Sequence, residues 1–222
     1  DAYNNLGVAF LNLDQLDKAV KSYKTALKLK PDFVEAINNL GIGLYNLGRM
    51  KDAVKSYEKV IAIQPDFVKA YNNLGNALME LGQLDEALKS YKAALKLKPD
   101  FVEAINNLGI TFYKLHQLDD AMNCYDRALV LDPDFADAHN NIGTVLLERG
   151  QLNDAVKSYK EALKLKPEFV EALNNMGLTL NKLLQAHDAI KYYERAIAIK
   201  PDYVDAYANL AIVLKDLKRF DE

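Results

Sequence analysis

Side chains able to carry out acid–base or metal chemistry are few and scattered in this chain of 222 residues. There are three histidines, His116, His139 and His187, and one cysteine, Cys124. A zinc site needs such ligands at short, regular spacings, and no two of these residues stand at one. The sequence also contains no nucleophile elbow and no phosphate-binding loop. We therefore expect no catalytic residue, no metal site and no cofactor in this chain.

The most regular polar feature is a pair of adjacent asparagines that recurs through the chain. Asparagine is a mediocre helix former, because its amide competes for backbone groups. Its carboxamide offers both a donor and an acceptor, so a row of them can hydrogen-bond the main chain of an extended peptide. Alternatively, the amides tie neighbouring helices together. The predicted peptide-binding asparagines are Asn5, Asn38, Asn39, Asn72, Asn73, Asn106, Asn107, Asn140, Asn141, Asn175 and Asn209.

Apolar, aromatic and amide side chains follow the asparagines along the same predicted helix face. At about 100° per residue, this face points away from the apolar stripe that should pack in the core. Exposed apolar and aromatic groups are suitable anchors for a peptide; the alternative is that they partly bury against the next repeat. They complete the predicted site: Ile42, Tyr45, Asn76, Met79, Ile110 and Tyr113.

The elements that position these residues repeat at a fixed interval. Pro31 and Pro65 are 34 residues apart, and all six prolines keep this spacing. Columns of glycine, alanine and tyrosine, which begin at Gly7, Ala19 and Tyr23, keep the same spacing. A period of this length is typical of helical repeat arrays.

Each period contains two amphipathic stretches. Ile37, Leu40 and Leu44 follow the three-and-four spacing of a helix, and Tyr57 and Val60 belong to a second stripe. The small residues of the glycine and alanine columns should let the two helices approach closely, with the tyrosine beside them. One hairpin leaves its other flank apolar, so the hairpins are expected to stack.

Glycine and proline mark the predicted helix ends. Gly48 follows the first stretch, where a residue able to adopt positive φ ends a helix, and His116 replaces the glycine of this column. Pro65 ends the second stretch, because proline cannot continue the hydrogen-bond ladder. Asp66 is expected to cap the next helix. At the C-terminal end, a new helix is expected to start at Arg219.

The motif Asn38-Asn39-Leu40-Gly41, followed by Leu44, Ala53, Tyr57 and Pro65, resembles the tetratricopeptide repeat (TPR) in length and in its main columns. The resemblance covers the whole chain. It implies an all-α, right-handed superhelix of helical hairpins, in which the first helix of each pair lines the concave side. We expect one array over residues 1–222, with repeats at 1–33, 34–67, 68–101, 102–135, 136–169 and 170–203 and a partial repeat at 204–222.

The row of asparagines is similar to the asparagine ladder in the TPR arm of O-linked N-acetylglucosaminyltransferases. That resemblance implies binding of an extended peptide through the second asparagine of each pair. Asparagine in this column is also common among tetratricopeptide repeats in general, where it joins adjacent helices. Both roles therefore stay open for this chain.

The predicted function is a protein–protein interaction scaffold that binds an extended peptide or partner segment in its concave groove. The alternatives are the substrate-recognition arm of a larger glycosyltransferase-type enzyme and a self-assembling array with uncapped ends at Ile212 and Phe220. The segment itself is expected not to be an enzyme and to belong to a longer protein.

Charge and composition narrow the expected partners and location. A net charge of −3 with interspersed signs argues against nucleic acid. No apolar run is long enough for membrane insertion. A single cysteine is consistent with the cytoplasm or another reducing compartment.

Overall fold

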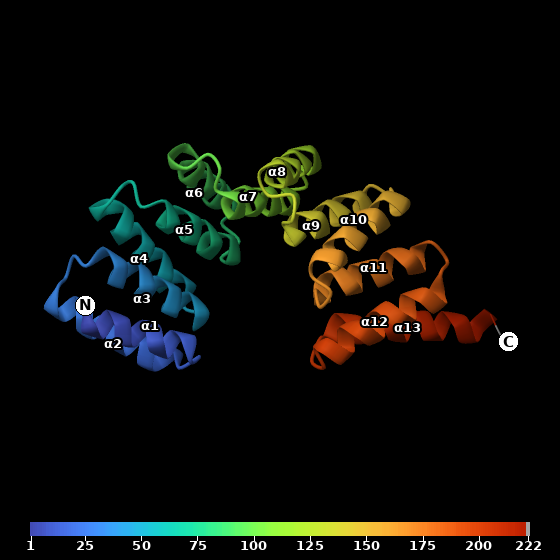
Figure 1. The fold of residues 1–222 in the computed structure, drawn as a ribbon, viewed down its shortest axis with the longest axis horizontal. Coiled ribbons are helices and arrows are strands. Elements are labelled where there is room, and N and C mark those ends of the chain that lie inside the picture. Colours follow the sequence, from blue (N-terminus) through green and yellow to red (C-terminus); the bar gives the residue numbers. More distant parts are fainter. Residues whose placement is uncertain (221–222) are drawn as a thin grey trace. The chain divides into compact units, whose positions relative to one another are not determined.

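The protein is helical throughout the part that the structure describes. The computed structural model describes the backbone of residues 1–220 and the side chains of residues 1–218, and every regular element in that part is an α-helix (Figure 1). The helices are α1 (Ala2–Asn12), α2 (Leu16–Leu29), α3 (Val34–Asn46), α4 (Met50–Ile63), α5 (Val68–Glu80), α6 (Leu84–Leu97), α7 (Val102–Lys114), α8 (Leu118–Leu131), α9 (Ala136–Glu148), α10 (Leu152–Leu165), α11 (Val170–Lys182), α12 (Ala186–Ile199) and α13 (Val204–Phe220).

The helices form two compact units, Asp1–His116 and Gln117–Glu222. In unit 1, the pairs α1/α2, α3/α4 and α5/α6 are hairpins, and each second helix packs on the first helix of the next pair. In unit 2, α8 packs on α9, the pairs α9/α10 and α11/α12 are hairpins, and α13 packs on α12. The predicted all-helical solenoid of hairpins is therefore confirmed.

A contact between glycine and tyrosine joins the two helices of each hairpin. Tyr57 of α4 is 2% exposed and lies against Gly41 of α3. A Cβ atom added at Gly41 would lie 2.5 Å from Tyr57 Cε1, closer than any real contact allows. Ala53 is fully buried one turn before the tyrosine. The small columns thus allow the close helix approach that the sequence predicts.

The turn between the two helices of a hairpin has one conformation in both units. At the end of α3, Gly48 N–H donates to Tyr45 O and Arg49 N–H donates to Leu44 O, both at 2.9 Å. These two bonds define a Schellman motif, and Gly48 has a φ of +73°. The same column has positive φ at Asp14, Gly82, His116, Gly150 and Leu184. The predicted helix stop is confirmed, including the histidine that replaces glycine.

The predicted capping role of Asp66 is wrong. Helix α5 begins one residue later, its N-cap is Phe67, and no side chain caps it. Phe67 N–H donates to Gln64 O at 3.1 Å, which closes a tight turn around Pro65 and Asp66. Because this turn places the aspartate before the cap position, its carboxylate does not serve the first turn of the helix.

The prediction that a new helix starts at Arg219 is also wrong. Helix α13 runs from Val204 to Phe220 without interruption. Lys218 stands in the column where the other first helices end with positive φ. Leu184 in the same column takes positive φ, whereas at Lys218 the backbone keeps helical conformation. Asp221 and Glu222, also assigned to the new helix, lie outside the described residues.

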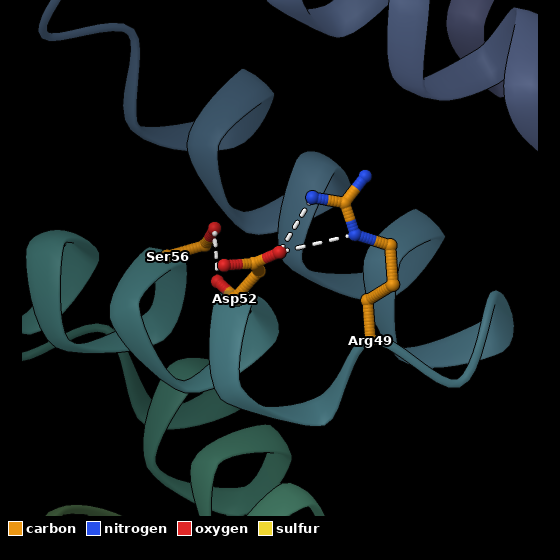
Figure 2. Close-up of polar contacts among 3 residues, drawn as sticks. All are labelled: Arg49, Asp52 and Ser56. Atoms are coloured by element: carbon orange, nitrogen blue, oxygen red, sulfur yellow. Dashed lines mark hydrogen bonds and ion pairs between the residues drawn. The ribbon is translucent and has the colours of Figure 1, made fainter.

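A small polar cluster organises the start of α4 (Figure 2). The Arg49 guanidinium donates two hydrogen bonds to Asp52 Oδ2, at 3.0 Å from Nε and 2.5 Å from Nη2. Ser56 Oγ donates to the Asp52 backbone oxygen at 3.0 Å. Both charged side chains are about half-exposed, so this ion pair contributes little to stability.

Candidate functional site

The first asparagine of each pair is buried. Asn38 is 6% exposed, Asn72 8%, Asn106 5% and Asn140 7%. The expectation that these side chains point away from the packed interior is therefore wrong. A buried carboxamide must find hydrogen-bond partners, since an unsatisfied one costs free energy.

The partner of the buried asparagine is the second asparagine of the next repeat. In unit 1, Nδ2 of Asn39 donates to Asn4 Oδ1 at 3.0 Å, and Asn73 and Asn107 donate to Asn38 and Asn72 at 3.3 Å. In unit 2, Asn175 donates to Asn140 at 3.2 Å and Asn209 to Asn174 at 2.9 Å. Asn4 and Asn174, which were not among the predicted site residues, are thus acceptors in this row. The asparagines do tie adjacent first helices together.

The tie uses only part of the hydrogen-bonding capacity of the second asparagine in each pair. Asn39 and Asn73 are half-buried, and each donates one N–H across to the preceding first helix. A carboxamide has two N–H groups and an oxygen that accepts two bonds. For these two residues, the remaining N–H and the oxygen have no protein partner among the described residues. The structural tie therefore leaves hydrogen-bonding capacity at the surface.

Asn76 and Met79, two of the predicted contact residues, bind other residues of unit 1. Tyr91 Oη donates to Asn76 Oδ1 at 2.7 Å, and Asn107 Nδ2 donates to the same oxygen at 3.0 Å. Thr111 Oγ1 lies 3.7 Å from Met79 Sδ. These contacts join α5, α6 and α7 below the surface, so Asn76 and Met79 hold the site in place as well as border it.

The other four predicted contact residues, Ile42, Tyr45, Ile110 and Tyr113, are all half-buried. Burial, together with the nearby Glu80 carboxylate, raises the pKa of Tyr45, so its hydroxyl stays neutral. A neutral phenol beside half-exposed aliphatic groups offers both apolar area and a hydrogen bond. We define the first-helix surface of unit 1 as Asn39, Ile42, Tyr45, Asn73, Asn107, Ile110 and Tyr113.

Two buried hydroxyl groups have no partner among the described residues. They belong to Tyr23 and Tyr193, whose side chains are fully buried. Burial raises the pKa of Tyr193 to about 12. Leu178 stands in the column of Asn76, so the Tyr193 hydroxyl lacks the acceptor that Tyr91 has. In the sequence, this difference is visible as leucine at position 178, where the equivalent position 76 holds asparagine.

The residues considered for catalysis or metal binding have separate surroundings. His139 Nε2 is 3.1 Å from Pro133 O, His116 is in a turn with a φ of +56°, and Cys124 is half-buried on α8. Within the described part of the chain, no group of three or more histidine, cysteine or acidic residues could hold a metal ion. No described helix is long and apolar enough to span a membrane.

Comparison with protein families identifies the class of the protein. The model described as the cilia and flagella-associated protein 70 C-terminal domain matches residues 33–222, and the tetratricopeptide repeat model matches residues 1–33. The chain belongs to the tetratricopeptide repeat proteins, within the family of that C-terminal domain. As a class, tetratricopeptide repeat proteins are protein-interaction scaffolds. No curated protein matches the sequence.

Solved structures share the fold at low sequence identity. The APC/C hetero-tetramer Cut9-Hcn1 has a chain similar to this one, with a TM-score of 0.84, 18% identity and 96% of this chain covered. This chain spans 42% of the length of that one. Pseudomonas aeruginosa pilF has a TM-score of 0.78 and 19% identity, with 95% of this chain and 96% of that chain covered.

YrrB, described as a TPR protein with an unusual peptide-binding site, has a TM-score of 0.59 and 22% identity over 85% of this chain and 97% of its own. At these identities, the likeness shows the fold alone.

Three finer expectations stay predictions: the likeness to the arm of O-linked N-acetylglucosaminyltransferases, the role as a substrate-recognition arm and self-association. For self-association, Ile212 on α13 is 53% exposed, whereas the side chain of Phe220 lies outside the described residues.

Proposed function

We propose that the chain binds an extended segment of a partner protein on the first-helix surface of unit 1. The observation that carries the proposal is the tie between asparagines of successive repeats. It holds Asn39 and Asn73 in equivalent positions, one per repeat, and leaves an amide oxygen and one N–H on each. A structural tie and a ligand site are therefore compatible in the same side chain.

The chemistry of this row suits a peptide main chain. A peptide in extended conformation presents alternating N–H and C=O groups, and a carboxamide pairs with both. Ile42 and Tyr45 of α3, with Ile110 and Tyr113 of α7, add half-exposed apolar area at either end of the row. Main-chain bonds then supply affinity that does not depend on sequence, and the apolar residues select side chains.

A related use of the fold is known in one similar protein. YrrB, which shares the fold, is described with a peptide-binding site, although its low identity carries no residue over to this chain. The asparagine row of this chain supplies its own physical reason for peptide binding.

The experiment that tests the proposal compares the two asparagines of each pair. An unbiased displayed peptide library is selected on the parent chain. Recovered peptides are then measured against a variant with Asn39→Ala and Asn73→Ala and against one with Asn4→Ala and Asn38→Ala. Both variants remove the same two ties, and the first also removes the exposed amides. We expect at least tenfold weaker binding in the first variant and near-parental affinity in the second.

Circular dichroism and urea unfolding provide the control for folding. The two variants should differ in stability, because the first leaves the buried Asn4 and Asn38 carboxamides without their donors. The second leaves the half-buried Asn39 and Asn73 amides, which water can reach. Equal loss of binding in both variants would show that the asparagines act through the repeat packing alone. Full binding by the first variant would place the site elsewhere.

A further inference from the structure

A groove lies between α10 and α12, two of the second helices of unit 2, on residues that the proposed function does not use. The α10–α12 groove has a volume of about 510 Å³. Its floor is formed by Met176 and Leu180 of α11, which are 1% and 6% exposed. Half-buried Val156 of α10 and Tyr192 of α12 line its walls. The groove is therefore built from three packed helices and combines an apolar floor with polar walls.

Cationic groups outnumber carboxylates around this groove. Lys160, Lys191 and Arg195 line it together with one acid, Asp188. Asp188 already accepts a hydrogen bond from Lys191 Nζ at 2.8 Å. Lys160 has no ion-pair partner among the described residues. Two positive charges are thus left over beside an apolar floor, which is complementary to an acidic ligand.

The Arg195 guanidinium is held in position. Its Nη2 donates to Pro167 O at 3.3 Å, and the group lies 5.8 Å from the centre of the Tyr192 ring. These contacts leave other N–H groups of the fork available, and a positioned guanidinium binds carboxylates well. Tyr192 itself departs from its column, which holds Ser22, Ser56, Ser90, Cys124 and Ser158 in the other second helices.

Two grooves of unit 1 each have either the surplus of positive charge or the apolar surface, but not both. Between α2 and α4, Lys21, Lys24, Lys28 and Arg49 surround a surface to which Val20 contributes the one aliphatic side chain. Between α4 and α6, Ile61, Tyr71 and Leu74 form an apolar surface with one acid and one lysine, so its charge balances. The α10–α12 groove combines an apolar floor with a surplus of positive charge.

We propose that the α10–α12 groove binds an acidic segment of a partner protein that carries a large apolar side chain. The apolar side chain lies over Met176 and Leu180, and flanking carboxylates pair with Lys160 and Arg195. Half-buried Leu183, in the turn between α11 and α12, adds apolar area to the lining. This site is independent of the asparagine row, which is tested in unit 1.

The test is a selection of random displayed decapeptides on the parent chain, with removal of those that also bind a Lys160→Glu, Arg195→Glu variant. The expected peptides carry aspartate or glutamate on both sides of leucine, phenylalanine or tyrosine. Their affinity should fall at least tenfold in the charge-reversed variant and severalfold in Tyr192→Ser, which restores the column residue. A Lys21→Glu, Lys24→Glu variant is the matched control in unit 1 and should bind as the parent does.

Circular dichroism checks whether each variant keeps its helicity. The proposal is overturned if selection yields no peptides that distinguish parent from charge-reversed variant. It is also overturned if the unit 1 control loses the same affinity, because binding then follows net charge and not the groove. Peptides that bind here must keep their affinity in the Asn39→Ala, Asn73→Ala variant, so the two proposals fail separately.

Discussion

The α5/α6 hairpin of unit 1 and the α11/α12 hairpin of unit 2 share one packing contact and differ around it. A Cβ atom added at Gly75 would lie 2.5 Å from Tyr91 Cε1, and one added at Gly177 would lie 2.6 Å from Tyr193 Cε1. The tyrosine hydroxyl, however, is bonded to Asn76 in the first hairpin and unpartnered in the second. The ring contact thus defines the hairpin, whereas its polar surroundings vary.

The turns and outer faces of the two hairpins differ as well. Gly82 has positive φ at the first turn, and Leu184 takes the same conformation at the second. Ser90 is buried on α6, where it bonds the Glu86 backbone oxygen, but Tyr192 replaces it on α12 and lines a groove. The second hairpin therefore has the same backbone arrangement as the first, with a strained turn residue and one more aromatic side chain on its outer face.

The shared contact should produce the largest effect. Gly75→Ala and Gly177→Ala each place a methyl group against a rigid ring, and overpacking typically costs about 1–3 kcal/mol. Alanine recovers up to about 1 kcal/mol of helix propensity, so we expect a net loss of about 1–2 kcal/mol. Urea unfolding of both variants measures it. A loss in one unit alone would show that the ring contact is not equivalent in the two hairpins.

Ala211 is the natural control for this substitution. It stands in the glycine column of α13, where no tyrosine packs on it among the described residues and its side chain is exposed. Ala211→Gly should cost about 1 kcal/mol through helix propensity alone. A larger cost would mean that the column is small for a reason other than the tyrosine ring.

Removal of the tyrosine hydroxyl should change the stability of the two hairpins differently. Tyr91→Phe loses the 2.7 Å bond to Asn76 and should cost about 1 kcal/mol. Tyr193→Phe removes a buried, unpartnered hydroxyl and should be neutral or stabilising by up to about 1 kcal/mol. Urea unfolding, with hydrogen exchange to locate the change, tests both. Equal effects in the two hairpins would contradict the difference in hydrogen bonding.

Exchange of the two turn residues should produce opposite signs. Gly82→Leu forces leucine to a φ of +74° and should cost about 1 kcal/mol. Leu184→Gly relieves the same strain at a φ of +61°, and we expect a gain of about 0.5 kcal/mol after the extra entropy of glycine in the unfolded chain. Thermal and urea unfolding measure both changes. If Leu184→Gly destabilises, Leu184 makes a stabilising contact that its 92% exposure does not indicate.

The smallest effect concerns two exposed ion pairs, one from each unit. A hydrogen bond from Arg49 lowers the pKa of Asp52, and one from Lys191 lowers the pKa of Asp188 (Figure 2 shows the first pair). The stabilisation is therefore present above the unfolded aspartate pKa of about 3.9 and is lost as the pH falls through the lower folded value. The pKa of Lys191 is raised by Asp188, so its contribution is lost as the pH rises through that raised value.

Titration of the carboxyl carbons by NMR checks these directions. Arg49→Gln should return the pKa of Asp52 toward its ordinary value and leave Asp188 unchanged. Added salt should weaken both shifts, since both pairs are exposed. An ordinary pKa for Asp52 in the parent would show that the Arg49–Asp52 ion pair does not form in solution.

Much of the fold was predictable because its rules are local. The turn column illustrates this: one residue with positive φ follows the first helix of each hairpin, and the fixed period locates it at Gly48 and Gly82. His116 was placed correctly for the same reason. The cap was assigned to Asp66, one residue too early, because its position depends on where the turn around the preceding proline closes. A sequence pattern does not locate a helix end to a single residue.

The candidate site was predictable in its residues and less so in their exposure. Periodicity placed both asparagines of a pair on one helix face, but adjacent residues on a helix differ in direction by about 100°. Asn38 therefore lies buried against the neighbouring first helix, whereas Asn39 is half-exposed. The groove at Tyr192 was not predicted, since it requires three helices from two hairpins.

The sequence by itself determined the repeat, the helix pairs, the turn positions and the glycine–tyrosine contact. These follow from backbone conformation and side-chain size within one 34-residue period, such as Gly41 to Gly75. The tertiary structure alone decided that hydrogen bonds join asparagines of successive repeats. It also decided that the Tyr193 hydroxyl lacks an acceptor and that a groove lies between α10 and α12. Those features join side chains of different repeats, and their distances depend on how neighbouring hairpins pack.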